Sequence, residues 1–175
     1  DVTNINEVQK TVDEVKKDWG KINILIHGAG VLADKYIHEK TDEQFDKVFN
    51  TKVLGFKNLL EAVKDDELSH ICCFSSVAAR LGNAGQSDYS MANEILNKVC
   101  VSEYKAREGK CVVKSINWGP WEGGMVAPEL KAYFKARGVA LIPLKEGADM
   151  FVHELEDGSA DVEVVIGGGD IENFQ

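Results

Sequence analysis

Ser76, Tyr89, Asn93 and Lys52 are the residues whose types and spacing point most clearly to chemistry. Tyr89 and Asn93 lie four apart, so on a helix they project from the same face. A serine hydroxyl and a tyrosine phenol that point at one spot suit a carbonyl oxygen of a substrate. A tyrosine can act as a general acid near neutral pH only if a cation lowers its pKa from about 10. Lys52 is the candidate for that cation.

The central stretch, residues 74–93, reads FSSVAARLGNAGQSDYSMAN. The pattern predicts a strand that runs into Ser76, then a glycine-rich loop, then a helix opened by Tyr89 and capped by Ser87 or Asp88. Each of these features is common by itself. It is their combination in one stretch that favours a catalytic site.

This pattern resembles the active site of a ketoreductase domain of the short-chain dehydrogenase/reductase superfamily, as found in polyketide synthases and multidomain fatty-acid synthases. In most of that superfamily a lysine follows the tyrosine by four residues. Here that position holds Asn93, and Lys52 precedes Ser76 by twenty-four residues, an exchange typical of the synthase ketoreductases. The segments GQSDYSMANEILNK and NWGPWEGGM resemble most the ketoreductases of polyunsaturated-fatty-acid and polyketide synthases.

Three other segments resemble the cofactor site of these domains. Residues 27–30, HGAG, resemble the loop that lines the cofactor, with His27 expected to be packed within it. Residues 117–121, NWGPW, resemble the segment that passes the nicotinamide, and residues 1–3 resemble a motif whose aspartate contacts adenine. The cofactor-site residues implied are Asp1, His27, Gly28, Ala29, Gly30, Lys52, Tyr89, Trp118, Gly119 and Pro120.

The resemblance implies hydride transfer from NADPH to the β-carbon of a β-ketoacyl thioester carried by an acyl carrier protein. Tyr89 would supply the proton and Ser76 a second hydrogen bond. Lys52 would hold the ribose and lower the tyrosine pKa. Asn93 would support the lysine or a proton-relay water. The other domains of the synthase are the implied partners.

Product stereochemistry is implied by the loop after HGAG. Ketoreductases that give the D (3R) alcohol carry Leu-Asp-Asp there, and this chain has Leu32, Ala33 and Asp34. Those that give the L product tend to carry a tryptophan eight residues before the tyrosine, where this chain has Leu81. The D (3R) product is therefore expected. The implied substrate and lid residues are Asp34, Gln86 and Met125, with a lid at about residues 120–140.

Composition is that of a globular protein. The 175 residues are 44% hydrophobic and 28% charged, and the net charge of −9 argues against nucleic acid or an anionic membrane as partner. No apolar run is long enough to span a membrane. The four cysteines lie within apolar stretches and not at metal-ligand spacings, which predicts reduced core thiols of a cytoplasmic protein and no metal site.

Hydrophobic periodicity predicts an α/β fold with a doubly wound parallel sheet, Rossmann-like, connected by right-handed crossovers. An apolar stripe from Ile5 to Trp19 predicts a first helix, ended by Gly20. Residues 22–26 predict a strand buried on both faces. The remaining predictions are helices at 41–64, capped by Thr41, and at 143–155, a short lid helix between Pro128 and Gly138, and strands at 70–74, 112–116 and 162–166.

A dinucleotide-binding fold opens with a strand and a glycine-rich turn that seats the pyrophosphate, and this fingerprint is not found before Ile22. Residues 1–175 are therefore expected to be the C-terminal two-thirds of a single catalytic ketoreductase domain that lacks its N-terminal β-α-β portion. Such a fragment would be inactive alone. The missing turn leaves one alternative open, a non-catalytic structural or docking module derived from a ketoreductase. A structural half-domain, however, would be expected to lack the four candidate residues that this chain keeps.

Overall fold

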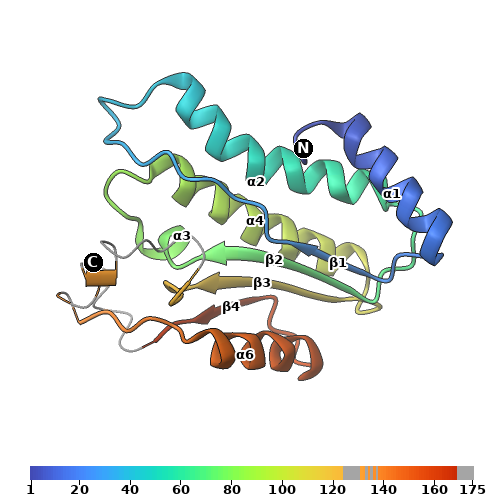
Figure 1. The fold of residues 1–175 in the computed structure, drawn as a ribbon. Coiled ribbons are helices and arrows are strands. Elements are labelled where there is room, and N and C mark those ends of the chain that lie inside the picture. Colours follow the sequence, from blue (N-terminus) through green and yellow to red (C-terminus); the bar gives the residue numbers. More distant parts are fainter. Residues whose placement is uncertain (124–130, 133, 135, 137, 169–175) are drawn as a thin grey trace.

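The structure, a computed structural model, describes residues 1–123, 131, 132, 134, 136 and 138–168. Helices and strands alternate along the chain (Figure 1). In chain order the elements are α1 (Ile5–Trp19), β1 (Ile24–His27), α2 (Asp42–Ala62), β2 (His70–Ser76), α3 (Ala78–Leu81), α4 (Ser87–Ala106), β3 (Val112–Trp118), α6 (Leu144–Glu156) and β4 (Glu163–Ile166).

The four strands form one parallel sheet in the order β1-β2-β3-β4. In its register Leu25 pairs with Ile71, and Ile71 with Val113. Because every strand runs in the same direction, all four carboxyl ends lie at one edge of the sheet. The predicted α/β, Rossmann-like architecture with a parallel sheet is confirmed.

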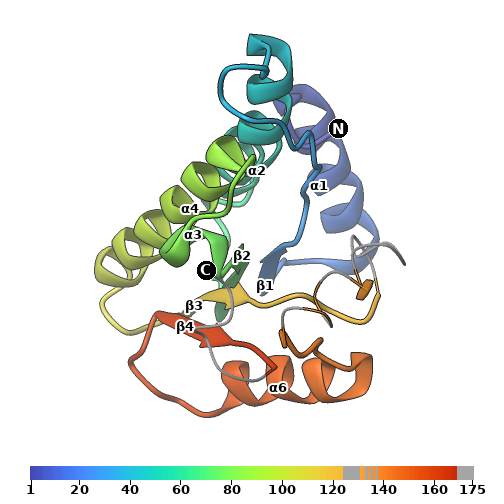
Figure 2. The ribbon, with the colours of Figure 1, turned by 90° about the vertical axis from the view of Figure 1, so that its left-hand side faces the viewer.

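Helices cover both faces of this sheet (Figure 2). On one face α1, α2 and α4 enclose a core that includes Phe56, Ile71 and Leu96. On the other face α6 packs through Phe151 and Leu155 on Cys72, Ile116, Trp118 and Ile166. Adjacent strand residues such as Ile71 and Cys72 therefore belong to different cores, as the two-residue period of a strand requires.

The last crossover has the opposite hand to the first two. The helices α2 and α4 connect successive strands on one face, whereas α6 connects β3 to β4 on the other face while the sheet grows in the same direction. Right-handed crossovers throughout, as predicted from the alternation, are therefore wrong for β3-α6-β4. Strand β3 does not lead straight into α6, because a long connection intervenes in which Trp121 and Ile142 form an isolated parallel bridge.

The strand β1 is buried on only one face. Leu25 and His27 are buried, but Ile24 and Ile26 are 50% and 45% exposed. The prediction of burial on both faces is wrong here, because α6 packs on β3 and β4 and no described helix covers β1 on that side. The stripe of α1 is likewise only partly buried, since Val8 and Val12 enter the core while Trp19 is 87% exposed.

The helix boundaries follow the predicted signals with two exceptions. Thr41 forms a capping box with Gln44 at the start of α2, as its cap position predicted. In contrast, α4 begins at Ser87, and neither Ser87 nor Asp88 is its cap residue, because the carboxylate of Asp88 forms a buried ion pair instead. The short helix α3 was not predicted. The lid helix and Met125 lie outside the described residues.

In the described parts of the chain, no helix is long and apolar enough to cross a membrane, and no three His, Cys, Asp or Glu residues cluster as metal ligands would. The cysteines Cys72, Cys73, Cys100 and Cys111 are all free and buried, as predicted for core thiols.

The substitution Gly147→Ala tests the packing of α6 on the connection that follows β3. A Cβ at Gly147 would lie 2.5 Å from the ring of Trp121 and 2.9 Å from Ile142. We expect the variant to lose roughly 1–3 kcal/mol of unfolding free energy through overpacking, although alanine is the better helix former by about 1 kcal/mol. Denaturant unfolding measures this. The exposed Glu146→Ala is the control, and a stabilised Gly147→Ala would contradict the packing.

Candidate active site

The candidate residues gather at the carboxyl edge of the sheet. Gly28 directly follows β1, and Ser76 and Trp118 end β2 and β3 as register partners. The helices α2 and α4 pack against each other on one face of the sheet and supply Lys52 and Tyr89. In open α/β sheets, ligands bind at this edge.

Lys52 is a buried residue of α2. Its side chain is almost fully enclosed, with the residue 4% exposed. Its Nζ donates to the backbone oxygen of Phe74 at 2.9 Å and lies 5.5 Å from the centre of the Tyr89 ring. Burial lowers the pKa of Lys52 from 10.5 to about 8. Lys52 is therefore not a solvated surface lysine.

Tyr89 keeps its proton in this setting. Burial raises the pKa of its phenol, although side-chain contacts with Ser76 and Asn93 partly oppose the rise, and the charge of Asp34 adds to it. The lowered tyrosine pKa expected from Lys52 is wrong for this structure, because desolvation of the phenolate dominates. A neutral phenol is the form that can give a proton.

The two serines that end β2 contact different groups. Ser76 Oγ accepts the amide hydrogen of Ala78 at 3.2 Å and is the serine in contact with Tyr89. Ser75 Oγ lies near the backbone oxygen of Asn93 at 3.2 Å and Oδ1 of Asn117 at 3.0 Å. Its one hydrogen can be donated to either. Ser76 therefore belongs to the site, and Ser75 ties the strand to α4.

Asn93 has one satisfied and one unsatisfied side-chain atom. Its Nδ2 donates to the backbone oxygen of Tyr89 at 2.8 Å, one turn earlier on α4. Its Oδ1 is buried with no hydrogen-bond partner among the described residues. An unsatisfied buried acceptor costs about 1–3 kcal/mol. Such an atom beside Tyr89 is suited to accept from a bound donor.

His27 is packed, as predicted. It is 1% exposed and stacks on Phe56 with ring centres 5.5 Å apart. Its Nε2 donates to the backbone oxygen of Lys52 at 2.9 Å, so it fixes the turn of α2 that carries the lysine. Burial, and then the charge of Lys52, lower the pKa of His27 to about 4.

Residues 1–3 lie against α2 one to two turns beyond Lys52. Asn58 Nδ2 donates to the backbone oxygen of Val2 at 2.9 Å, and Asp1 Oδ1 accepts from the amide and hydroxyl of Thr3 at 2.9 Å each. A Cβ at Gly55 would lie 2.8 Å from Val2, so this position requires glycine. Sequence reasoning missed Gly55, although it stands among apolar residues of a helix, where glycine calls for an explanation.

The segment from Trp118 to Trp121 is held on both sides. The indole of Trp118 packs on Phe74 and Trp121, with ring centres 5.6 and 4.8 Å apart. The amide of Gly119 donates to the backbone oxygen of Ile166 at 2.7 Å. The backbone oxygen of Pro120 accepts from the amide of Ile142 at 2.8 Å. Both tryptophans therefore pack against neighbouring aromatic rings.

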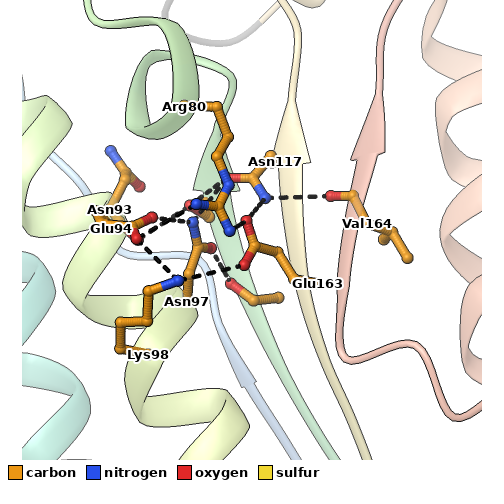
Figure 3. A network of polar contacts seen from close by, with 10 residues as sticks. Arg80, Asn93, Glu94, Asn97, Lys98, Asn117, Glu163 and Val164 are labelled. Carbon is orange, nitrogen blue, oxygen red and sulfur yellow. Dashed lines mark hydrogen bonds and ion pairs between the residues drawn. The ribbon is translucent and has the colours of Figure 1, made fainter.

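A buried polar network behind the site was missed by the sequence reasoning (Figure 3). Asn97 Nδ2 donates to Asn117 Oδ1 at 3.1 Å, and Ser115 Oγ donates to Asn97 Oδ1 at 2.7 Å. At the surface of the network, Glu163 pairs with Arg80 and lies 3.8 Å from Lys98. Asn97 follows Asn93 by one turn on the same face of α4, and this repeat of asparagine is the sequence signal that could have indicated the network.

Comparison with known proteins places the chain in a family. The sequence profile of the KR domain family matches residues 1–123. The chain is 43% identical over 168 residues to a polyunsaturated fatty acid synthase of Thraustochytrium sp., an alignment that covers 95% of this chain and 6% of that protein. It is 31% identical over 175 residues to polyketide synthase PksN of Bacillus subtilis, where it covers 95% of this chain and 3% of that protein.

Solved structures agree with this placement. A ketoreductase domain from the bacillaene assembly line matches with a TM-score of 0.85 and 33% identity, over 99% of this chain and 43% of that one. An N-terminal ketoreductase from the macrolactin assembly line matches with a TM-score of 0.83 and 27% identity. This match covers 99% of this chain and 33% of that chain. A parallel α/β sheet of the Rossmann-like class is thus confirmed. The chain belongs to the KR domain family, and the resemblance to synthase ketoreductases is confirmed.

The pH dependence of stability tests the burial of Lys52. The unfolded chain binds a proton at this lysine up to about pH 10.5, whereas the folded chain releases it near pH 8. Burial of Lys52 therefore costs stability below pH 8, and the cost disappears as the pH rises toward 10.5. We expect Lys52→Met to be the more stable protein at pH 7, with an advantage that shrinks across this window. A difference in unfolding free energy that does not change with pH would contradict the buried charge.

Proposed function

We propose that this chain carries the catalytic groups of a ketoreductase that reduces a β-ketoacyl thioester, bound to an acyl carrier protein, within a multidomain fatty-acid or polyketide synthase. The observation that carries this proposal is the buried Lys52 cation beneath the Tyr89 ring, at the sheet edge where Ser76 also lies. The family and its relatives support the reaction class.

In this reaction Tyr89 holds the phenolic proton and gives it to the oxygen of the ketone as that oxygen becomes an alkoxide. Ser76 donates a second hydrogen bond to the same oxygen. General acid catalysis of this kind contributes roughly 10² to 10⁴ in rate, and a fixed second donor adds electrostatic stabilisation of the oxyanion.

Lys52 contributes a positive charge and a hydrogen-bond donor to the floor of the site. Burial holds the pKa of Lys52 near 8, so the cation dominates at neutral pH. Asn93 Oδ1, buried and unpaired among the described residues, is the acceptor available to a bound water or to Lys52. We propose that the Lys52 ammonium gives up the proton that replaces the one lost by Tyr89, through a water that donates to Asn93 Oδ1.

NADPH is the cofactor we propose, and it would supply the hydride. The donor set fits a nicotinamide dinucleotide, because a buried lysine amine and an unpaired amide oxygen are partners for ribose hydroxyls. The other residues we propose to hold it are Asp1, Ala29, Gly30, Tyr89, Trp118, Gly119 and Pro120, with His27 behind them.

A non-catalytic docking module is less well supported. An enclosed lysine amine is costly to keep, and the charge of Lys52 and the unpaired oxygen of Asn93 have no role in a scaffold. We further propose that residues 1–175 form part of a single ketoreductase domain, with a substrate lid at about residues 120–140.

Tyr89→Phe in the complete protein tests the catalytic assignment. The variant removes a proton donor and little packing, so we expect turnover to fall by roughly 10² or more while NADPH binding by fluorescence titration stays within about twofold. Tyr104→Phe, on the same helix, is the matched control and should keep normal turnover. Near-normal turnover by Tyr89→Phe would refute the assignment.

The dual role of Lys52 has a separate test. We expect Lys52→Ala to weaken NADPH binding and to lower turnover together, because we propose that the lysine serves both cofactor and phenol. Fluorescence titration and steady-state kinetics measure the two effects. A change in only one of them would show that the dual role is wrong.

We propose a D (3R) alcohol as product. Asp34 accepts from Gln86 Nε2 at 2.8 Å, so the carboxylate is tied to the loop before α4 and is not simply a solvated group. Chiral chromatography of the product of the complete protein measures the outcome. We expect the 3R alcohol to predominate and the Asp34→Ala variant to lose part of this preference, whereas a mainly 3S product would contradict the assignment.

A further inference from the structure

A buried ion pair lies immediately before Tyr89. Lys40 Nζ and Asp88 Oδ2 are 2.7 Å apart, and their side chains are only 4% and 1% exposed. The two residues are 48 positions apart in sequence. Lys40 ends the segment that follows the HGAG loop, and Asp88 is in the first turn of α4. The pair therefore joins the two segments that border the proposed site.

Each partner makes a second contact that extends the link. Lys40 Nζ also donates to the backbone oxygen of Ala33 at 2.9 Å. Asp88 Oδ1 accepts the backbone amide hydrogen of Tyr89 at 2.9 Å. One charged bridge thus runs from the backbone at Ala33 to the backbone at Tyr89.

Two further bonds connect the same segments beside the ion pair. The amide of Lys35 donates to the backbone oxygen of Gly85 at 3.0 Å, and Gln86 donates to Asp34 at 2.8 Å. Gly85 has a φ of +81°, a conformation that favours glycine, and its position against the Lys35 backbone depends on it. The two loops are held as one unit.

We propose that Lys40 and Asp88 are positioning residues, which set the loop of Asp34 against the start of α4 and so fix the direction from which a substrate meets Tyr89. Neither residue touches the reacting atoms. The proposal rests on the proposed function for its catalytic consequence, but the mechanical link between the two segments stands on the contacts alone.

The energetics of a buried pair favour a positioning role over a stabilising one. Replacing a buried ion pair by neutral groups of similar volume is often neutral for stability, whereas removing one partner leaves a buried charge and is strongly destabilising. The double variant Lys40→Met/Asp88→Asn keeps both shapes and the acceptor for the Tyr89 amide, while it removes the charges and the bond to Ala33. This variant separates positioning from folding.

The experiment compares the wild-type complete protein with this double variant. We expect the double variant to lose turnover on the order of 10² and to produce a less pure alcohol stereoisomer, with an NADPH dissociation constant within about twofold of wild type. Lys145→Met, which breaks the exposed pair with Asp149, is the control and should change none of these. Wild-type turnover and stereoisomer purity in the double variant would overturn the proposal.

Amide hydrogen exchange gives a readout that needs no activity. The Lys35 amide, bonded to Gly85 across the two segments, should exchange about tenfold faster in the double variant and at the wild-type rate in Lys145→Met. The single variant Lys40→Arg keeps the charge, so its Lys35 amide should stay largely protected even if the single variant Lys40→Met loses that protection. Unchanged exchange in the double variant would refute the link even if the wild-type protein reduces no ketone. Faster exchange in the double variant, together with a wild-type protein that reduces no ketone, would leave the link intact and refute only the proposed function.

Discussion

The burial of one lysine amine governs the arrangement of this site. Placing a charged amine in the interior costs several kcal/mol unless it is compensated, and among the described residues the only hydrogen bond made by the Lys52 amine is to the backbone oxygen of Phe74. The surroundings keep this geometry. His27 fixes the backbone of α2 at Lys52, and Gly55 lets Val2 pack closely beside it. A buried amine that makes few hydrogen bonds but is held in a fixed position is characteristic of a functional site.

The parallel sheet converts distant sequence positions into neighbours at one edge. The ends of β1 and β2 bring the HGAG loop and Ser76 to that edge, and α2 and α4, packed on one face of the sheet, contribute Lys52 and Tyr89. Behind the edge, Asn97 and Asn117 fix α4 on the sheet through buried hydrogen bonds. The face of α4 that carries Tyr89 is therefore held by the buried amides of Asn97 and Asn117 and by Asp88 in its first turn.

Much of this could be predicted from sequence, because period and spacing are local signals. The capping box at Thr41, the parallel strands and the packed His27 follow from such signals. The hand of the last crossover and the exposure of Ile24 do not, since both depend on which face α6 covers. The raised pKa of Tyr89 likewise depends on burial, which spacing does not reveal.

The central claim is that Lys52 and Tyr89 act as one unit. A double-mutant cycle in the complete protein tests it most directly, with Lys52→Met and Tyr89→Phe made singly and together and kcat/KM measured at neutral pH. Groups that act as a unit give strongly non-additive effects. The account predicts that the double variant is about as slow as the slower single variant. Additive losses of transition-state free energy would show that the two residues act independently and would contradict it.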